Sequence, residues 1–249
     1  MHIIVQSFWL PKHGNTQAEY EDAFCSEKPI DQNADTFVRV AAVADGATET
    51  SFSKTWANLL VQAYCQGELN DEKTLIQHLP QLQEQWYAEV TQKPLPWYAV
   101  EKLQRGAFSA LFGLTLYENR YDIMAIGDSC LFHIRGDKLE LEHSFPIEDS
   151  EQFNNRPLLL SSVAAPNENI AQHIVYKQTL SWQKGDEFYL MTDALACWFL
   201  QMYEKKCQQW KEVRSLKQSD FEQWIQDLRE TKALRNDDVT LLRITQEEI

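Results

Sequence analysis

Five aspartates lie where apolar stretches of the chain begin or end, namely Asp22, Asp45, Asp128, Asp193 and Asp237. Carboxylates gathered at the ends of neighbouring strands raise one another's pKa and destabilise the fold unless a cation lies between them. Oxygen ligands of this kind, completed by water, are the ligands that Mg²⁺ and Mn²⁺ prefer. The pattern therefore predicts a site for divalent metal ions.

Two such ions about 3.5–4 Å apart can activate a bridging water for in-line attack on phosphorus and stabilise the leaving oxygen. A turn is the alternative explanation for any one of these aspartates, and Asp45 followed by Gly46 is by itself typical of a turn. Gly46 would also let the backbone pass close to whatever the Asp45 carboxylate binds. The recurrence of acidic strand ends along the chain favours the metal site.

The elements that would position these carboxylates follow from the hydrophobic periodicity. Apolar runs predict strands at 2–9, 37–44, 108–116, 121–126, 130–134, 139–141, 170–180, 187–192 and 239–244. Apolar residues at helical spacing predict helices at 52–65, 72–90, 97–104, 195–205 and 219–230. Candidate N-caps are Thr48, Thr50 or Ser51 for the first helix and Ser219 for the last.

The strands between 108 and 141 are separated by short turns, which predicts an antiparallel meander. Residues 143–169 are polar and contain three prolines, so we expect an irregular segment. A loop of this length inside a compact domain is usually functional or mobile. We expect it to form a flap that contributes to substrate specificity.

Length and composition limit the classes of protein that this chain can represent. At 249 residues and 44% hydrophobic, the chain is long enough for a sizeable core, and we expect one domain spanning residues 1–249. The formal net charge of −14 disfavours nucleic acid and anionic membranes as partners. Lys205, Lys206, Lys211 and Arg214 form the only basic cluster, which we interpret as a solvated loop, with contact to an acidic partner as the alternative.

The five cysteines are widely spaced and odd in number, which indicates neither a disulfide framework nor a zinc site. The N-terminal residues do not resemble a secretion signal, and no stretch approaches membrane-spanning length. We therefore expect a soluble cytoplasmic protein with reduced cysteines. His133, on an apolar strand, is expected to be a core residue with its hydrogen bonds satisfied.

The acidic motifs, taken in order, resemble those of the metal-dependent serine/threonine phosphatases of type 2C. The chain has YEDAF at 20–24, VADG at 43–46, GDS at 127–129, LMTDAL at 190–195 and NDDVT at 236–240. These motifs look like the family's early acidic motif, its strand-ending Asp-Gly, its Gly-Asp-Ser, its later Asp-Gly and its closing Asp-Asn-x-Thr. All five occur in the family's order across nearly the whole chain.

The resemblance implies an α+β fold, a four-layer α-β-β-α sandwich of two antiparallel sheets flanked by helices. It implies that Asp22 bridges two metal ions, that Asp45 and the Gly46 carbonyl bind one of them, and that Asp193 and Asp237 bind the other. Asp128 matches the position that, with Asp193, can bind a weaker third ion. A metal-activated water would be the nucleophile, so no covalent phospho-enzyme is expected.

Several positions depart from the family's pattern. The family commonly has a phosphate-binding arginine five residues before the early aspartate, where this chain has Gln17. Lys12 or His13 could replace it, and His13 could also serve as the general acid for the leaving group. Other departures are Thr48 and Glu49 after the Asp-Gly motif, Ala194 in place of glycine and Asp238 in place of asparagine.

The leading hypothesis is a metal-dependent phosphatase, with Mg²⁺ or Mn²⁺ as cofactor, that hydrolyses phosphoserine and phosphothreonine in proteins. Its partners would be a phosphoprotein and the opposing kinase, and we expect a monomer. One alternative is an inactive phosphoprotein-binding module that kept the fold and the metal ligands. Another is a hydrolase of a small phosphorylated metabolite, because the missing arginine leaves the substrate class open.

Overall fold

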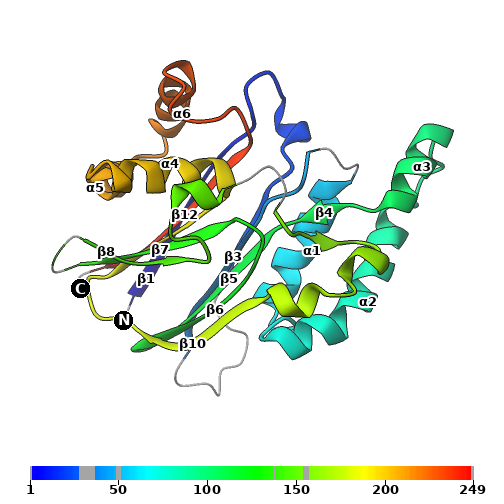
Figure 1. Ribbon diagram of the computed structural model, residues 1–249, viewed down its shortest axis with the longest axis horizontal. Coiled ribbons are helices and arrows are strands. Elements are labelled where there is room, and N and C mark those ends of the chain that lie inside the picture. The colour runs from blue at the N-terminus through cyan, green and yellow to red at the C-terminus, as the bar shows by residue number, and fades with distance from the viewer. Residues whose placement is uncertain are drawn as a thin grey trace. The chain divides into compact units, whose positions relative to one another are not determined.

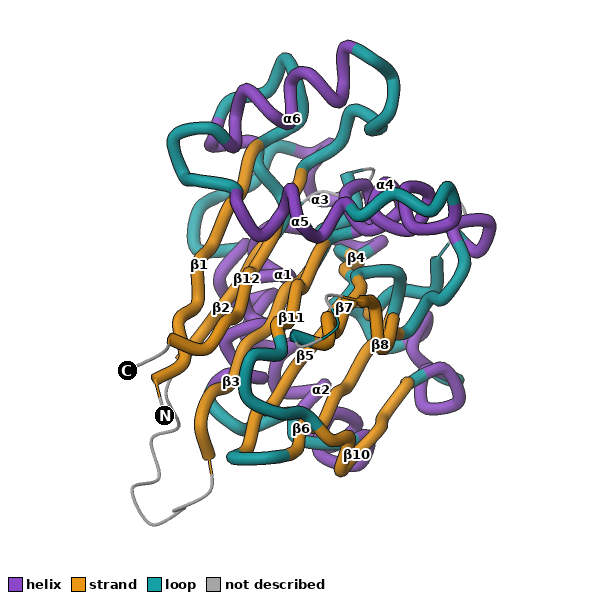
Figure 2. Tube along the Cα trace, turned by 90° about the vertical axis from the view of Figure 1, so that its left-hand side faces the viewer, coloured by secondary structure: helices purple, strands orange, loops and turns teal. Residues whose placement is uncertain are grey.

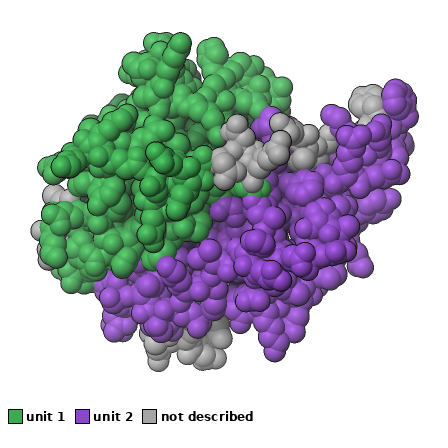
Figure 3. All heavy atoms as spheres, in the orientation of Figure 1, with its two compact units in different colours: residues 1–20, 128–157, 183–249 green, residues 21–127, 158–182 purple. Residues whose placement is uncertain are grey.

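The computed structural model describes residues 2–27, 37–48, 52–136, 138, 140–153 and 157–247. Contacts divide the chain into two compact units (Figure 3). Unit 1 comprises residues 1–20, 128–157 and 183–249, and unit 2 comprises residues 21–127 and 158–182. Each unit is built from segments distant in the sequence, and each contains one five-stranded antiparallel sheet.

The sheet of unit 1 has the strand order β1-β12-β11-β7-β8. Its strands are β1 (His2–Leu10), β7 (Cys130–Arg135), β8 (Glu140–Phe145), β11 (Glu187–Met191) and β12 (Val239–Glu247). Its helices are α4 (Asp193–Glu204), α5 (Gln209–Ser215) and α6 (Phe221–Glu230). The helices pack on the sheet through buried aromatic side chains, with ring centroids 4.2 Å apart for Phe132 and Phe199 and 5.4 Å apart for Phe8 and Phe221.

The main sheet of unit 2 has the strand order β10-β6-β5-β3-β2. Its strands are β2 (Ala23–Glu27), β3 (Phe37–Ala44), β5 (Leu111–Tyr117), β6 (Arg120–Ile126) and β10 (Val175–Ser181). Its helices are α1 (Ser53–Cys65), α2 (Glu72–Val90) and α3 (Trp97–Arg105), and β4 (Phe108–Ser109) pairs with β9 (Leu160–Ser161). Helix α1 packs against β2, β3 and β5, and α2 packs against α1 (Figures 1 and 2).

The expected α+β class, with two antiparallel sheets and helices packed on them, is confirmed. The apolar stripes of the predicted helices are the faces that become buried, as for Trp56 and Leu60 on α1 and Leu75 and Trp86 on α2. The predicted strand at 37–44 and helix at 72–90 have the bounds of β3 and α2. Burial of these stripes removes apolar surface from water and gives each unit its core.

The predicted meander between 108 and 141 is wrong, because β6 and β7 do not pair. Strand β5 pairs with β6 in unit 2, whereas β7 pairs with β8 in unit 1. The chain changes sheets at Gly127, whose φ of 92° lies in the left-handed region that glycine adopts at low cost. Periodicity identified four strands but carries no information about which of them pair.

Three further expectations about local structure are wrong. The basic cluster is not all loop, because Lys211 and Arg214 lie on α5, whose Trp210 and Val213 are buried. The N-cap of α1 is Phe52 at φ 68°, and Thr50 and Ser51 lie outside the described residues. Helix α6 begins after Asp220, so Ser219 is not its cap.

The expected strand at 170–180 is also shorter than predicted. A 3₁₀ turn covers Ile170–His173, and β10 begins at Val175. The irregular segment between 143 and 169 contains the end of β8, the strand β9 and 3₁₀ turns at Ser150–Gln152 and Ala165–Asn167. The polar composition of this segment concealed these short elements.

The expectation of wholly reduced cysteines is also wrong, because Cys25 and Cys65 form a disulfide within unit 2. Their Cα atoms lie 6.5 Å apart, where the end of α1 packs against β2. Their separation of 40 positions in the sequence conceals this proximity. The other three cysteines are free.

No helix in the described ranges is long and apolar enough to span a membrane.

Candidate metal centre

Unit 1 brings three of the predicted aspartates to one end of its sheet. Asp193 opens α4 directly after β11, and Asp237 comes just before β12. Hydrogen bonds between Thr192 and Thr240 hold these two strand ends together, with the Thr240 amide donating to the Thr192 hydroxyl at 2.9 Å. A carboxylate oxygen of Asp128 lies within 4.8 Å of one of Asp193. The unit therefore gathers acidic groups where two adjacent strands end.

Burial and mutual repulsion disfavour the charged forms of these carboxylates. Burial, followed by the nearby charge of Asp193, raises the pKa of Asp128 to about 7. The same two causes, in the same order, raise the pKa of Asp237. The Asp193 Oδ1 atom is buried and accepts no hydrogen bond within the described part of the chain. A cation bound between these groups would relieve the repulsion and satisfy the unpaired oxygen.

Arg235 also belongs to this cluster, although no sequence motif predicts it. Its guanidinium forms an ion pair with Asp193 and lies 3.2 Å from a carboxylate oxygen of Asp237. The side chain is 48% exposed, so it reaches the carboxylates from the solvent side. The sequence places Arg235 two residues before the predicted ligand Asp237. A single arginine near a motif does not indicate which carboxylate it contacts.

Unit 2 places Asp22 and Asp45 side by side through the register of one strand pair. Strands β2 and β3 are antiparallel, and Ala23 lies opposite Ala44. Asp22 precedes Ala23 and Asp45 follows Ala44, so both aspartates leave the ladder at the same end. Asp22 is 2% exposed. Each prediction that these aspartates lie at a strand end is confirmed.

Gly46 allows the backbone after Asp45 to lie close to the backbone before Asp22. A Cβ atom built on Gly46 would lie 2.5 Å from the Glu21 carbonyl oxygen, closer than real Cβ atoms come to backbone. The Asp45 backbone is fixed on the other side, where its carbonyl accepts from the Ala110 amide at 2.9 Å and from the Ser109 hydroxyl at 2.9 Å. The backbone beside Asp45 is therefore rigid, and position 46 has no room for a side chain.

The loop with the predicted substrate-binding residues lies beside the last acidic motif in unit 1. The Lys12 amide donates to Asp238 at 2.8 Å, and the His13 amide donates to the Asn236 side chain at 2.7 Å. Asp238 is buried, so the aspartate that replaces the family's asparagine holds this loop in place. Gln17 lies in the 3₁₀ turn Gln17–Glu19 with its side chain exposed.

The donor set fits a divalent metal ion. All the predicted ligands offer oxygen, as carboxylates or as the Gly46 carbonyl, and hard oxygen ligands suit Mg²⁺ and Mn²⁺. The unpaired Asp193 oxygen and the raised pKa of Asp128 and Asp237 are the features expected of carboxylates arranged to bind a cation. These carboxylates thus define a candidate centre for divalent metal ions.

Comparison with known proteins identifies the class more closely. The family model of protein phosphatase 2C matches residues 11–240, so the chain belongs to this family. No curated protein sequence matches the chain significantly. The family match spans every predicted metal ligand from Asp22 to Asp237.

Several solved structures share the fold. The serine/threonine phosphatase PstP/Ppp of Mycobacterium tuberculosis matches with a TM-score of 0.62 and 14% identity over 99% of each chain. Stp1 from Staphylococcus aureus matches with a TM-score of 0.59 and 14% identity over 100% of this chain and 96% of that one. PppA, described as a key regulatory component of T6SS in Pseudomonas aeruginosa, matches with a TM-score of 0.57 and 17% identity over 98% of each chain.

Family membership confirms the expectation of a metal-dependent serine/threonine protein phosphatase. It also confirms Mg²⁺ or Mn²⁺ as the cofactor, since phosphatases of this family use these ions. A further structure of the PstP catalytic domain, with a TM-score of 0.57 and 14% identity over 98% of this chain and 99% of that one, holds two manganese ions.

Proposed function

We propose that this chain removes phosphate from phosphoserine and phosphothreonine in proteins, using a set of aspartates to hold two metal ions. The proposed ligands are Asp22, Asp45, the Gly46 carbonyl, Asp193 and Asp237. Asp128 would join Asp193 in binding a third, weaker ion. The observation that carries the proposal is the buried Asp193 oxygen without a hydrogen-bond partner in the described residues, beside carboxyls of raised pKa.

The metal ions would supply an activated water for attack on phosphorus. The chain's own residues would hold the ions in place and keep the substrate in line with the attacking water. Lys12 and Gln17 are the proposed contacts for the substrate phosphate, and His13 is the proposed proton donor to the leaving serine or threonine oxygen. The hydrogen bonds from the Lys12 and His13 amides to Asp238 and Asn236, on either side of Asp237, support these roles.

The two units are proposed to be halves of a single domain, because each is discontinuous in sequence and one family model spans both. We further propose that the protein acts as a monomer in cytoplasmic signalling and opposes a serine/threonine kinase that phosphorylates the same protein. Three free cysteines support a reducing compartment, whereas the Cys25–Cys65 disulfide is a feature more typical of an oxidising one.

Substrate class can be tested with purified protein and Mn²⁺. Hydrolysis of phosphoserine and phosphothreonine peptides should exceed that of phosphotyrosine peptides and of small phosphorylated metabolites. Asp22→Asn and Asp237→Asn should each remove this activity. Preferential turnover of a metabolite would contradict the proposed protein substrate, and full activity in both variants would contradict the proposed metal ligands.

A further inference from the structure

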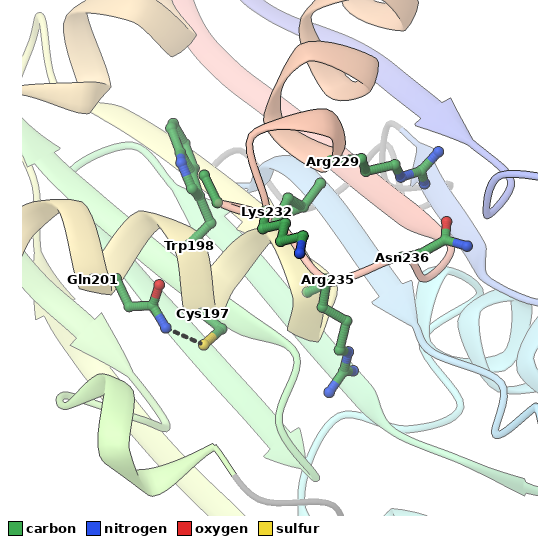
Figure 4. A pocket seen from close by; sticks show the side chains of 10 residues that line it. Cys197, Trp198, Gln201, Arg229, Lys232, Arg235 and Asn236 are labelled. Carbon is green, nitrogen blue, oxygen red and sulfur yellow. Dashed lines mark hydrogen bonds between the residues drawn. The ribbon is translucent and has the colours of Figure 1, made fainter.

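A basic pocket of about 470 Å³ lies within unit 1, between α4 and the segment that joins α6 to β12 (Figure 4). Arg229, Lys232 and Arg235 line it together with Asn236, Gln201 and the apolar side of Trp198 and Leu234, and no carboxylate of the described residues does so. The chain as a whole carries 37 acidic and 23 basic residues. The lining thus contains three cations and no acidic side chain, and Arg235 is the one of the three that is paired with the nearby Asp193 and Asp237.

In the turn after α6, Lys232 has a left-handed backbone conformation that is unusual for lysine. The Lys232 amide bonds to the Arg229 carbonyl at 3.0 Å, and the Ala233 amide bonds to the Leu228 carbonyl at 2.9 Å. This pair of bonds ends a helix with a left-handed residue that is usually glycine. Lys232 occupies that position at φ 58°, although a side chain there costs on the order of 1 kcal/mol.

The charge on the pocket's wall is not neutralised by contacts within the turn. Lys232 is exposed and forms no ion pair within the ranges that the structure describes. The Arg229 guanidinium donates to the carbonyls of Pro11 at 3.1 Å and Asp237 at 2.6 Å, which are neutral acceptors. Figure 4 shows Lys232 directed toward α4 and Arg229 directed toward the side of Asn236. The Lys232 ammonium is thus available to an anionic ligand.

The pocket borders the acidic cluster of unit 1. Arg235 lines the pocket and also bonds to Asp193 and Asp237, the proposed metal ligands. Cys197 and Gln201 follow Asp193 on α4 at intervals of four residues, so they continue the same helix face into the pocket. A peptide whose phosphorylated residue lies at the metal ligands would bring its neighbouring side chains toward this pocket.

We propose that this pocket binds a carboxylate side chain of the substrate peptide and gives the enzyme a preference for acidic residues near the phosphorylated one. The proposal rests on the proposed function for the position of the phosphorylated residue. Lys232 supplies an ammonium for a carboxylate, and Asn236 and Gln201 supply neutral polar groups. The net negative charge of the protein repels an acidic peptide, and the pocket offsets this long-range repulsion.

Two phosphoserine peptides test this preference, one with glutamate at the flanking positions and one with glutamine at the same positions. The acidic peptide should have the higher kcat/KM, and Lys232→Gln should lower the ratio of the two values by roughly threefold to tenfold, mainly through KM. Hydrolysis of an aryl phosphate, which has no flanking residue, should be unchanged in this variant. Lys211→Gln, at an exposed position on α5, is the matched control and should leave the ratio unchanged.

Calorimetric binding of the same peptides to metal-free protein separates this proposal from the proposed function. If the wild type hydrolyses nothing, tighter binding of the acidic peptide that is lost in Lys232→Gln would still support the pocket. An unchanged ratio and unchanged binding in Lys232→Gln, with aryl phosphatase activity intact, would overturn the proposal. The proposal would also be overturned if the only effect of Lys232→Gln were weaker inhibition by inorganic phosphate. That result would mean that the pocket binds the phosphate released by the reaction and not the peptide.

Discussion

The guanidinium of Arg235 forms an ion pair with the carboxylate of Asp193, at the position where the family's motifs predict a metal ion. The same guanidinium lies 3.2 Å from Asp237. Arg235 thus supplies positive charge to two mutually repelling carboxylates, of which Asp193 is buried and Asp237 is partly exposed. A metal ion bound by Asp193 and Asp237 would have to bind these carboxylates together with the Arg235 guanidinium or displace it.

Arg235→Gln is therefore expected to tighten Mn²⁺ binding, because a competing cation is removed from the ligands. The Arg235 side chain is about half exposed, so the gain should be no more than about 1 kcal/mol, or roughly fivefold in affinity. Without metal, the variant should unfold at a lower temperature than the wild type. Calorimetric titration with Mn²⁺ and thermal melts in chelator measure the two effects.

Arg214→Gln is the control for this prediction. Arg214 pairs with Glu187 at 2.8 Å and is 51% exposed, but Glu187 is not a predicted metal ligand. Its Mn²⁺ affinity should equal that of the wild type. Weaker Mn²⁺ binding in Arg235→Gln would contradict the view that the guanidinium competes with the metal.

Gly46→Ala should disrupt the approach of Asp22 and Asp45. The added methyl group would meet the Glu21 carbonyl oxygen at 2.5 Å, and neither backbone can yield without moving an aspartate. We expect a loss of about 1–3 kcal/mol in the free energy of unfolding, together with loss of phosphatase activity. Denaturant unfolding and aryl phosphate hydrolysis measure the two results.

Gly67→Ala separates loss of the site from general strain. Gly67 has a φ of 80°, and its nearest atoms lie 3.8 Å away, so alanine there adds backbone strain without a clash. It should lose about 1 kcal/mol of stability and keep its activity. If Gly46→Ala were as active as Gly67→Ala, the close approach at Gly46 would have no bearing on the metal ligands.

A buried carboxylate away from the candidate metal centre should govern acid stability. Burial opposes the charge of Asp186, but hydrogen bonds from His133 at 2.8 Å and from the amides of Gly136 and Gln183 at 3.0 Å lower the pKa of its carboxyl below the usual value. Arg135 adds an ion pair at 2.8 Å. A pKa lower in the folded chain means that this carboxylate stabilises the fold above the unfolded pKa, near 4. That contribution disappears as the pH falls through the folded value.

Asp186→Asn should therefore destabilise unit 1 at neutral pH by on the order of 3 kcal/mol, because it weakens the hydrogen bonds of buried donors and removes one of the two ion pairs of Arg135. The difference from the wild type should shrink in acid, where the wild-type carboxyl becomes protonated. Urea unfolding at pH 7 and pH 3 gives both values. Asp227→Asn, at an exposed position on α6, should show little change at either pH, and an equal effect in the two variants would contradict the assignment.

The Cys25–Cys65 disulfide can be tested by counting thiols. Protein denatured without reductant should expose three reactive thiols, from Cys130, Cys197 and Cys207. Reduction should raise the number to five and lower the melting temperature, because a closed loop of forty residues in the unfolded chain becomes open. Five thiols before reduction, in protein taken from the cytoplasm, would contradict the disulfide and support the reduced state predicted from the sequence.

The sequence predicted the positions of the carboxylates better than the connections between strands. The strand end at Asp45 was predictable because a continuous apolar run stops there. The change of sheet after Gly127 was not predictable, because periodicity is the same whichever partner a strand pairs with. The same limit concealed the proximity of Cys25 and Cys65, which only the packing of α1 on β2 creates.

Side-chain neighbours within the candidate metal centre were the least predictable feature. Arg235 lies two residues from a recognised motif, but its contact with Asp193 joins segments 42 residues apart. The amide of Lys12 reaches Asp238 across 226 residues. His133 was predictable as a core residue with satisfied hydrogen bonds, but its partner Asp186 was not. Residue types at strand ends indicate chemistry, whereas partners across the fold depend on tertiary packing.

The most direct test of the metal-dependent mechanism combines Mn²⁺ titration of metal-free protein with phosphopeptide hydrolysis on the same samples. The wild type should bind at least two ions and become active as they bind. Asp22→Asn and Asp193→Asn should each bind Mn²⁺ more weakly and lose activity by several orders of magnitude, while keeping the wild-type fold by circular dichroism. Turnover that persists in chelator, or variants that lose activity with unchanged Mn²⁺ stoichiometry and affinity, would contradict the assignment of these carboxylates as the metal ligands.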